Sequence, residues 1–456
     1  MSFRRAGLAL AVAALLTNGC ATYTATNVPL DTHDLATGYR SQTVLKTRTL
    51  GDVMVVLAFS GGGTRAAALA YGILEELRDT EIVVEGRERR LLDEVDTISS
   101  VSGGSLTAAY YGLYGDRIFE DFEERVLYDR IQTGLLLQWL RPLNWVRALT
   151  RLGNRTELAI DYYDRHFFEG ATFADLQDAG GPFIQINATD ISAGERFAFE
   201  QGHFDFLCSD VSQMHIARAV AASAAVPVVF HPVILENYAG QCGFERPDWL
   251  DDALASRESD PRRYYKAAAI DQYLDAEKHH YLNLVDGGLS DNIGIRGPLD
   301  NIMLTGGLWE RLERIDDEYP QRLLFIVVNA STRPRQSFAV SPQLPSLGAL
   351  IQSVSGTQIH RYNFETIELL RESMDRWSEE SSDGSNPLQA FLVEVAFDAV
   401  TDPADREFFN NVPTALQLEK ETVDRLRAIA RQLLNESPYY REFLDSFDVS
   451  VPEPAS

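Results

Sequence analysis

The sequence has few of the features that define several classes of protein. Only three of its 456 residues are cysteine, and its eight histidines form neither an HExxH motif nor another cluster with the spacing of zinc ligands. The first apolar run, Ala6 to Leu16, is too short to cross a bilayer as a helix. Because no cysteine or histidine cluster has the spacing of metal ligands, we expect no metal and no cofactor.

Positive charge is scarce as well. The chain has 41 basic against 67 acidic residues, which gives a net charge of -26. A field of this sign repels phosphate backbones, so we expect no nucleic acid partner. It also opposes approach to an anionic membrane, so that contact with lipid requires an anchor or a local exception.

One segment, residues 131–155, reverses this charge. It contains four arginines, no acidic residue, and the tryptophans Trp139 and Trp145 among several leucines. Arginine on one face of a helix and tryptophan and leucine on the other is typical of a helix that lies in a membrane surface. The alternative is a helix that packs its apolar stripe into the core.

The N-terminus has the pattern of an export signal. Arg4 and Arg5 precede the apolar run, and a small residue precedes Cys20. Residues 16–20 resemble the cleavage box of a bacterial lipoprotein. We expect a signal peptide over residues 1–19, lipid on Cys20 and, over the polar residues 20–48, a flexible tether to a membrane of the cell envelope. The alternative is cleavage nearby and release into the periplasm.

The two other cysteines are consistent with export. In an oxidising compartment Cys208 and Cys242 can close a disulfide across a loop of about 35 residues. Two separate buried thiols are the alternative.

Strand-like apolar runs alternate with helical patterns through most of the chain. Runs such as VMVVLAF, VDTISSV, FIQINATD and LLFIVVN are separated by helical stretches. This alternation predicts an α/β fold with a largely parallel central sheet covered by helices. Residues 375–387 are predicted to form a polar loop before a further strand and a closing helix near residues 422–435, so that residues 336–456 complete the same body.

Three glycines, Gly61 to Gly63, follow the apolar run that ends at Phe59 and precede a helical pattern. Consecutive glycines let backbone N–H groups turn into one concave pocket, and the start of a helix adds a positive dipole end. Such a loop suits an anion. Because the nucleotide-binding spacings GxxxxGK[ST] and GxGxxG are absent here, we interpret the loop as an oxyanion hole for acyl transfer.

Ser102 occupies the centre of the stretch SVSGG. This stretch fits the GxSxG pattern of a nucleophile elbow except that Ser100 replaces the first glycine. An elbow places its serine on a strained turn between a strand and a helix, so Ser102 is the candidate nucleophile. Ser99, Ser100 and Ser105 are interpreted as packing or capping residues. A Ser-Gly turn without chemistry is the alternative.

Asp286 follows the apolar run YLNLV and precedes two glycines. Ligand sites of open α/β sheets lie at the carboxyl ends of strands, which places this carboxylate with the two loops above. The alternative is a turn residue whose carboxylate bonds local backbone, as we expect of Asp291.

Together these three loops resemble the patatin-like phospholipase family, in which a glycine-rich oxyanion loop, a GxSxG elbow and an Asp-Gly-Gly motif occur in this order. The resemblance extends over about Val53 to Pro334 and includes the Ala/Ser-rich segment 217–233. The loops also look like those of the related cytosolic phospholipase A2 catalytic domains.

The resemblance implies a three-layer α/β/α fold with a catalytic domain over residues 49–335. It implies a Ser/Asp dyad without histidine, with Ser102 as nucleophile and Asp286 as base, that cleaves acyl esters of phospholipids or related lipids. The implied oxyanion hole is formed by Gly61, Gly62, Gly63 and Gly103.

An aspartate can accept a serine proton directly only if burial raises its pKa from about 4 toward the working pH. The site is therefore expected to be dry. Arg65, just beyond the glycines, is expected to bind a lipid phosphate, to hold the loop, or to form a surface ion pair.

Three further alternatives remain open. A hydrolase triad would require His360, the one histidine after Asp286, but this residue lies in a helical pattern and is interpreted as structural. The same acyl-serine could be passed to an alcohol by a transacylase. A lipid-anchored binding protein would keep the fold and lack the chemistry.

Overall fold

The computed structural model describes residues 25–46, 51–84, 86–129, 155–227, 229–313, 319–333, 347–381 and 387–447. Its centre is an eight-stranded sheet in the order β12-β11-β2-β5-β6-β10-β9, with β7 paired to β6 outside this path. These strands are β2 (Val53–Phe59), β5 (Val95–Val101), β6 (Phe183–Asp190), β7 (Glu195–Ala198), β9 (Val233–Glu236), β10 (Tyr281–Asp286), β11 (Arg322–Asn329) and β12 (Gln389–Ala396). Two small ribbons pair β1 (Val28–Pro29) with β8 (Ser209–Asp210) and β3 (Glu81–Val84) with β4 (Arg87–Arg90).

The sheet is mostly parallel, as the sequence predicts. The five strands from β12 to β6 run in parallel, whereas β7, β9 and β10 pair in antiparallel fashion. β6 extends beyond the end of β5, because Val101 is paired with Asn187 and β6 continues to Asp190. β10 runs beside this extension from the opposite direction and ends at Asp286, opposite Ala188. The ends of β5 and β10 therefore reach the same level of the sheet.

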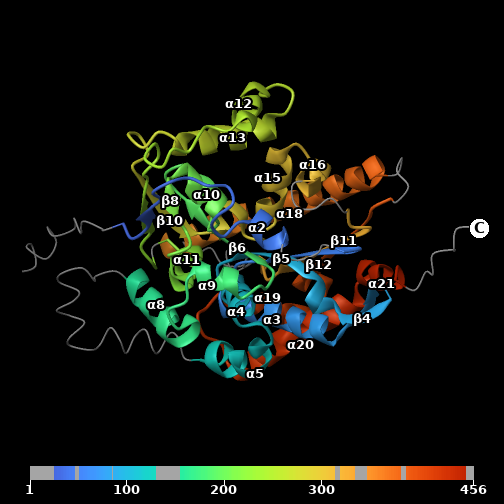
Figure 1. Cartoon of the computed structure of the whole chain (residues 1–456). Coiled ribbons are helices and arrows are strands. Elements are labelled where there is room, and N and C mark those ends of the chain that lie inside the picture. Colours follow the sequence, from blue (N-terminus) through green and yellow to red (C-terminus); the bar gives the residue numbers. More distant parts are fainter. Residues whose placement is uncertain are drawn as a thin grey trace, which may run out of the picture.

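Helices cover both faces of the sheet, so the fold has three layers (Figure 1). In Figure 1, α3 (Thr64–Asp79), α4 (Gly103–Tyr114), α5 (Ile118–Phe122) and α20 (Lys420–Glu436) lie below the sheet. α2 (Ser41–Lys46), α15 (Arg296–Thr305), α16 (Leu308–Glu313) and α18 (Leu347–Ser381) lie above it. The remaining α-helices are α8 (Arg155–Tyr163), α9 (Phe173–Asp178), α10 (Gln201–Phe206), α11 (Ile216–Ser223), α12 (Asp248–Ala255), α13 (Pro261–Tyr273), α14 (Gly288–Asp291), α19 (Pro403–Asn411) and α21 (Pro438–Asp445).

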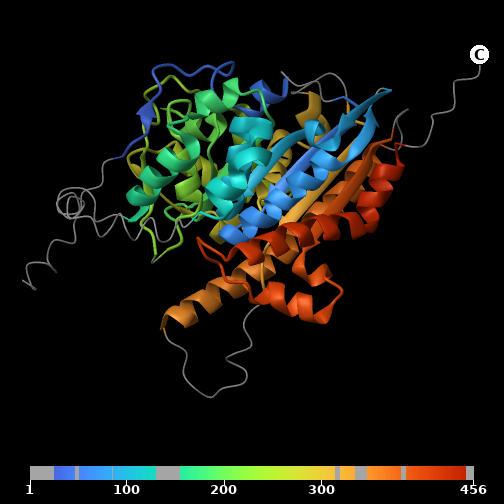
Figure 2. The same cartoon turned by 90° about the horizontal axis from the view of Figure 1, so that it is seen from below.

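Burial explains why the apolar runs form these elements. Six of the seven residues of β2 are buried, as expected for a strand covered by helices on both faces. α20 is amphipathic instead, since its buried residues recur at helical spacing and face α3 (Figure 2). These residues are Val423, Leu426, Ile429, Ala430, Leu433 and Leu434.

The prediction of a flexible tether over residues 20–48 is wrong for residues 25–46. Tyr39 is 1% exposed and stacks on Phe183, and Arg40 forms a buried ion pair with Asp205. The backbone N–H groups of Leu30 and His33 donate to the carbonyls of Cys208 and Cys242. This polar segment is ordered because one aromatic ring and one buried ion pair fix it to the body.

The C-terminal part adds to the same sheet and helical layers. β12 pairs in parallel with β11 over its full length, and α20 packs along α3. The predicted loop at residues 375–387 starts later than expected, because α18 continues to Ser381. Met374 and Trp377 are buried, so packing keeps this polar segment helical despite its serines.

Candidate active site

Ser102 lies on the turn between β5 and α4. Its backbone has φ 51° and ψ -120°, a conformation that residues with a side chain seldom adopt. The turn directs the side chain toward β10, where Ser102 Oγ donates a hydrogen bond to Asp286 Oδ2 at 2.9 Å. The two side chains are 7% and 9% exposed, so the contact is made in a largely dry site.

The carboxylate of Asp286 is held by neutral donors. Its Oδ1 accepts the backbone N–H of Gly288 at 2.8 Å, and Oδ2 accepts the Ser102 hydroxyl. Burial raises the pKa of Asp286 to about 6, and these two hydrogen bonds lower it in part. No ion pair with a lysine, arginine or histidine is formed by Asp286 within the described residues. A carboxylate with this pKa is ionised at neutral pH and still able to accept a proton.

Ser223, at the end of α11, connects the two loops. Its hydroxyl accepts the backbone N–H of Ser102 at 2.8 Å and donates to the carbonyl of Asn187 at 2.6 Å. Since its one proton is used in this way, the 3.1 Å contact with Ser105 makes Ser105 the donor. The Ser223 carbonyl accepts the N–H of Gly287, next to the carboxylate. Ser223 therefore positions both the candidate nucleophile, Ser102, and the candidate base, Asp286.

The sequence analysis did not single out Ser223. It lies in an Ala/Ser-rich helix, where a serine is most simply explained as a small packing residue. Its position near the proline segment after α11 was the one available signal.

The glycine loop packs directly onto the start of α4. A Cβ on Gly103 would lie 2.0 Å from the carbonyl oxygen of Gly63, and one on Gly63 would lie 2.3 Å from that of Ala415. Gly63 also has φ 62°. Only glycine fits at these two positions, so the loop and the nucleophile elbow are brought into backbone contact.

Gly61 cannot contribute to an oxyanion hole in this structure. Its N–H donates to the carbonyl of Asn292 at 2.8 Å, so the prediction for this residue is wrong. Within the described residues, no protein acceptor engages the N–H groups of Gly62 and Gly63. These two amides, and that of Gly103 at the start of α4, remain the candidate oxyanion donors.

Arg65 lies inside the protein rather than at its surface. It is 3% exposed, and its guanidinium donates to the carbonyls of Ala330 and Val412 and to the hydroxyl of Thr414. With these donors engaged, neither binding of a lipid phosphate nor a surface ion pair fits. Arg65 instead holds residues 412–414 against the first turn of α3.

Ser100 replaces the first glycine of the elbow without disturbing it. Its side chain is fully buried, and its hydroxyl donates to the carbonyl of Gln185 on the neighbouring strand β6. Ser99 and Ser105 are also fully buried. Asp291 bonds the backbone N–H groups of Gly294 and Arg296, as predicted for a turn residue.

Other candidate residues lie away from this site or outside the described part. His360, the histidine that a hydrolase triad would require, is exposed on α18. Cys208 and Cys242 are joined by a disulfide. Cys20 and most of the arginine-rich segment 131–155 lie outside the described residues. Among the described residues no cluster of metal ligands is found, and none of their helices is long and apolar enough to span a membrane.

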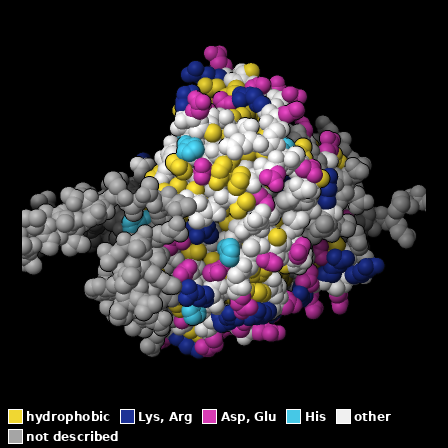
Figure 3. All heavy atoms as spheres, turned by 60° about the vertical axis from the view of Figure 1, so that its left-hand side comes forward, with side chains coloured by type: hydrophobic (Ala, Val, Ile, Leu, Met, Phe, Trp, Pro, Cys, Tyr) yellow, Lys and Arg dark blue, Asp and Glu magenta, His cyan; other side chains and the backbone are white. Residues whose placement is uncertain are grey.

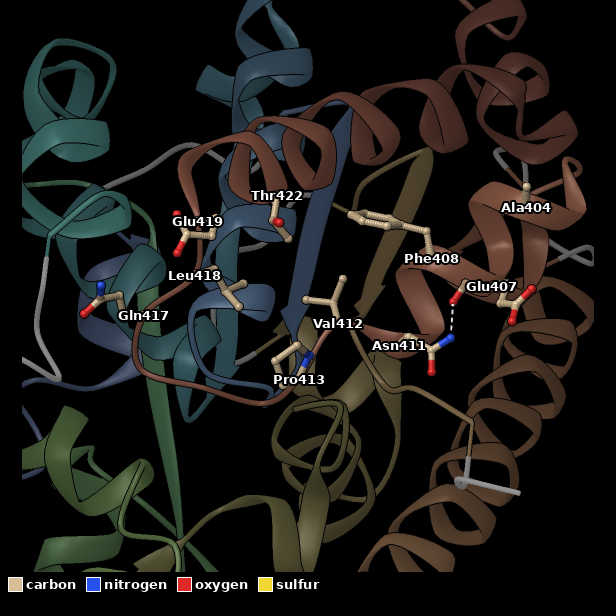
Figure 4. A pocket seen from close by; sticks show the side chains of 10 residues that line it. All are labelled: Ala404, Glu407, Phe408, Asn411, Val412, Pro413, Gln417, Leu418, Glu419 and Thr422. Carbon is tan, nitrogen blue, oxygen red and sulfur yellow. Dashed lines mark hydrogen bonds between the residues drawn. The ribbon is translucent and has the colours of Figure 1, made fainter. Parts of the chain in front are cut away.

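A groove of about 960 Å³ lies between α19, the loop that follows it and the start of α20 (Figure 4). Phe408, Val412 and Leu418 form its apolar wall. Ser102, Asp286 and the glycine loop do not line it, so it is not the reacting centre. Ala415 lies in the same loop, between the lining residues Pro413 and Gln417, and its carbonyl accepts the N–H of Thr64 beside the glycine loop.

Comparison with solved structures finds chains of low sequence identity to this one. Human GIVD cytosolic phospholipase A2 is 12% identical over 90% of this chain and 64% of its own, with a TM-score of 0.47. VipD from Legionella pneumophila is 12% identical over 95% of this chain and 72% of its own, with a TM-score of 0.30. This chain thus spans less than two thirds of the human enzyme. No curated protein matches it.

One family model matches more than half of the chain. Residues 57–299 match the model described as Patatin-like phospholipase. This range includes the glycine loop Gly61–Gly63, the elbow at Ser102, α11, and Asp286 with the two glycines that follow it. The match covers more than half of the 456 residues. The chain belongs to the patatin-like phospholipase family.

Proposed function

We propose that this protein is a serine acyl hydrolase that cleaves acyl esters of phospholipids or related lipids. The observation that carries the proposal is the 2.9 Å contact between Ser102 Oγ and Asp286 Oδ2, in a buried site where the pKa of the acid is raised to about 6. Membership in the patatin-like phospholipase family supports the choice of a lipid ester.

In the proposed reaction Ser102 Oγ attacks the ester carbonyl carbon while its proton passes to Asp286. The amides of Gly62, Gly63 and Gly103 donate to the oxyanion of the tetrahedral intermediate, and each such donor contributes about 3 kcal/mol. The intermediate collapses to acyl-Ser102, and the departing alkoxide takes the proton from Asp286. Water then attacks the acyl group, gives its proton to Asp286, and the fatty acid leaves as Ser102 is reprotonated.

Exposed apolar side chains near the site favour a lipid substrate. Val226 and Val229 are 41% and 48% exposed, directly after the Ala225 carbonyl that accepts the N–H of Asp286. Leu289, just beyond Asp286, is 42% exposed. One face of the molecule carries hydrophobic side chains over its middle, with most charged side chains toward its edges (Figure 3). Such a surface suits contact with acyl chains.

The proposal is tested with Ser102→Ala and Asp286→Asn. Both variants should lose hydrolysis of phospholipid vesicles, measured as released fatty acid, by about 10⁴-fold, because one lacks the nucleophile and the other cannot accept its proton. A fluorophosphonate probe should label the wild type at Ser102 and leave Ser102→Ala unlabelled.

The matched control is Ser259→Ala, which removes an exposed hydroxyl far along the chain on the loop before α13. It should retain activity and labelling. Labelling or hydrolysis that survives in Ser102→Ala would refute the assignment of the nucleophile.

A further inference from the structure

A second cavity, of about 420 Å³, lies beside the loop that carries Asp286. It is bounded by β7, α13, α14, α15 and α18, and it is large enough for a small ligand. Four cationic side chains line it, and we call it the basic cavity after them: Arg196, Arg262, Lys266 and Arg296. In a protein with 26 more acidic than basic residues, such a cluster runs against the overall composition.

Two acids also line the basic cavity, but both are already paired. Asp300 contacts Lys266 at 3.2 Å and Arg196 at 3.4 Å, and Glu195 contacts Lys266 at 3.1 Å. Four cations against two acids leave two positive charges without a carboxylate in the cavity wall.

The two remaining charges belong to Arg262 and Arg296. Neither forms an ion pair within the described residues. Arg296 is held in place by a hydrogen bond from Nε to the hydroxyl of Thr366 and by the ring of Tyr362, 4.9 Å from its guanidinium carbon. Its guanidinium is therefore oriented, and it interacts with the carboxylates of Asp291 and Asp300 only at longer range than an ion pair.

Arg196 adds an independent observation. It is 3% exposed, its Nη1 donates to Asn187 Oδ1, and its Nε is a buried donor that no acceptor of the described residues engages. This buried guanidinium, whose Nη groups contact Asn187 and Asp300, contributes positive charge to the wall of the cavity.

We propose that the basic cavity binds a phosphate-bearing group. A phosphate monoester carries close to two negative charges and three strong acceptor oxygens, which matches two guanidinium groups without an ion pair and the hydroxyl of Tyr362 in the wall. The same chemistry is present in the headgroup of an acidic phospholipid and in a soluble phosphate ester.

The basic cavity is connected to the reacting centre in two ways. Gly288 to Ser290, directly after Asp286, form part of its wall. Asn187, which accepts from Arg196, donates through Nδ2 to the carbonyl of Ser100 on the strand that carries the nucleophile. A bound phosphate therefore acts on substrate choice or on activity, and this consequence rests on the proposed function, whereas binding itself does not.

The test compares the double variant Arg262→Gln/Arg296→Gln with the control Arg246→Gln/Arg257→Gln. The control removes two arginines from the region of α12 and α13 that do not line the basic cavity. Binding is measured by calorimetry with glycerol 1-phosphate, in the Ser102→Ala background so that it does not depend on catalysis. We expect the cavity variant to bind at least about tenfold more weakly than the parent and the control to bind like the parent.

A second arm separates the two sources of phosphate. With active protein, the rate on vesicles of phosphatidylcholine with phosphatidic acid is divided by the rate on phosphatidylcholine alone. If the ligand is a lipid headgroup, this ratio falls about tenfold in the cavity variant. If the ligand is a soluble phosphate ester, added glycerol 1-phosphate changes the rate of the parent but not the rate of the cavity variant. Equal binding by parent and cavity variant would overturn the proposal, whatever the outcome for Ser102.

Discussion

The candidate active site and the basic cavity each contain a buried aspartate, Asp286 in the first and Asp300 in the second. Asp286 is surrounded by hydroxyls and amides, and burial raises its pKa to about 6. Burial also raises the pKa of Asp300, but Lys266, Arg196 and Arg296 outweigh it and leave this pKa below its usual value. The pKa values of these two buried aspartates thus shift in opposite directions. Of the two, Asp286 can serve as a base because no cation beside it stabilises its ionised form.

The strongest test of this contrast makes the same substitution at both acids. Asp300→Asn removes the partner of two buried cations, so we expect the free energy of unfolding to fall by about 3–5 kcal/mol. Asp286→Asn should have the opposite effect at pH 8. The pKa of Asp286 is about 6 in the folded protein and 3.8 in the unfolded chain. Above pH 6 the ionisation of Asp286 therefore lowers the free energy of unfolding by about 3 kcal/mol.

Urea denaturation of both variants at pH 8 and pH 4 measures these effects. The gain from Asp286→Asn should be lost at pH 4, where the carboxyl is protonated in the folded wild type. Destabilisation by both substitutions at pH 8 would contradict the contrast.

A smaller effect is expected from Ser223→Ala. The substitution leaves the Ser102 N–H and the Asn187 carbonyl without their partner, which costs about 1–3 kcal/mol. Because Ser223 positions the nucleophile, kcat should fall by about tenfold or more while KM changes little. Ser212→Ala, which removes the hydroxyl that bonds Asp210 away from the site, is the matched control. An unchanged kcat in Ser223→Ala would show that the turn at Ser102 keeps its conformation without the Ser223 hydroxyl.

The smallest effect, over the half unit of pH on either side of 6, is the dependence of activity on pH. Asp286 must be ionised to accept the proton of Ser102, so kcat/KM on a neutral ester should fall about tenfold per pH unit below about 6 and level off above it. Initial rates between pH 4.5 and pH 8, on protein shown to remain folded, measure this profile. A midpoint near 4 would indicate a solvated carboxylate instead of a dry one.

The sequence predicted most of the sheet, and it predicted a pairing of Ser102 with Asp286, whose side chains are in contact in the structure. Apolar runs gave β2, β5 and β6 within their observed bounds, and local patterns of glycine gave Ser102 and Asp286. Contacts between residues distant in sequence could not be predicted. Binding of a lipid phosphate, one of the three roles expected of Arg65, is wrong because its guanidinium donates to Ala330 and Val412, which belong to segments that no local pattern connects to it.

The same reason explains the other errors. The amide of Gly61 is engaged by Asn292, and the N-terminal segment is fixed by Tyr39, whose neighbours come much later in the chain. The basic cavity combines arginines from β7, α13 and α15. Arg262 and Lys266, which lie one helical turn apart on α13, were its one local signal.

The packing of α20 on α3 has a consequence for how the chain is made. Arg427 of α20 contacts Glu75 of α3, a partner translated 352 residues earlier. Until α20 leaves the ribosome, the face of α3 that packs against it, around Gly72, has no cover. A fragment that ends at residue 335 would lack both β12 and α20. Its strand β11 would then be an exposed edge of the sheet, and α3, which begins directly after the glycine loop, would lack its covering helix.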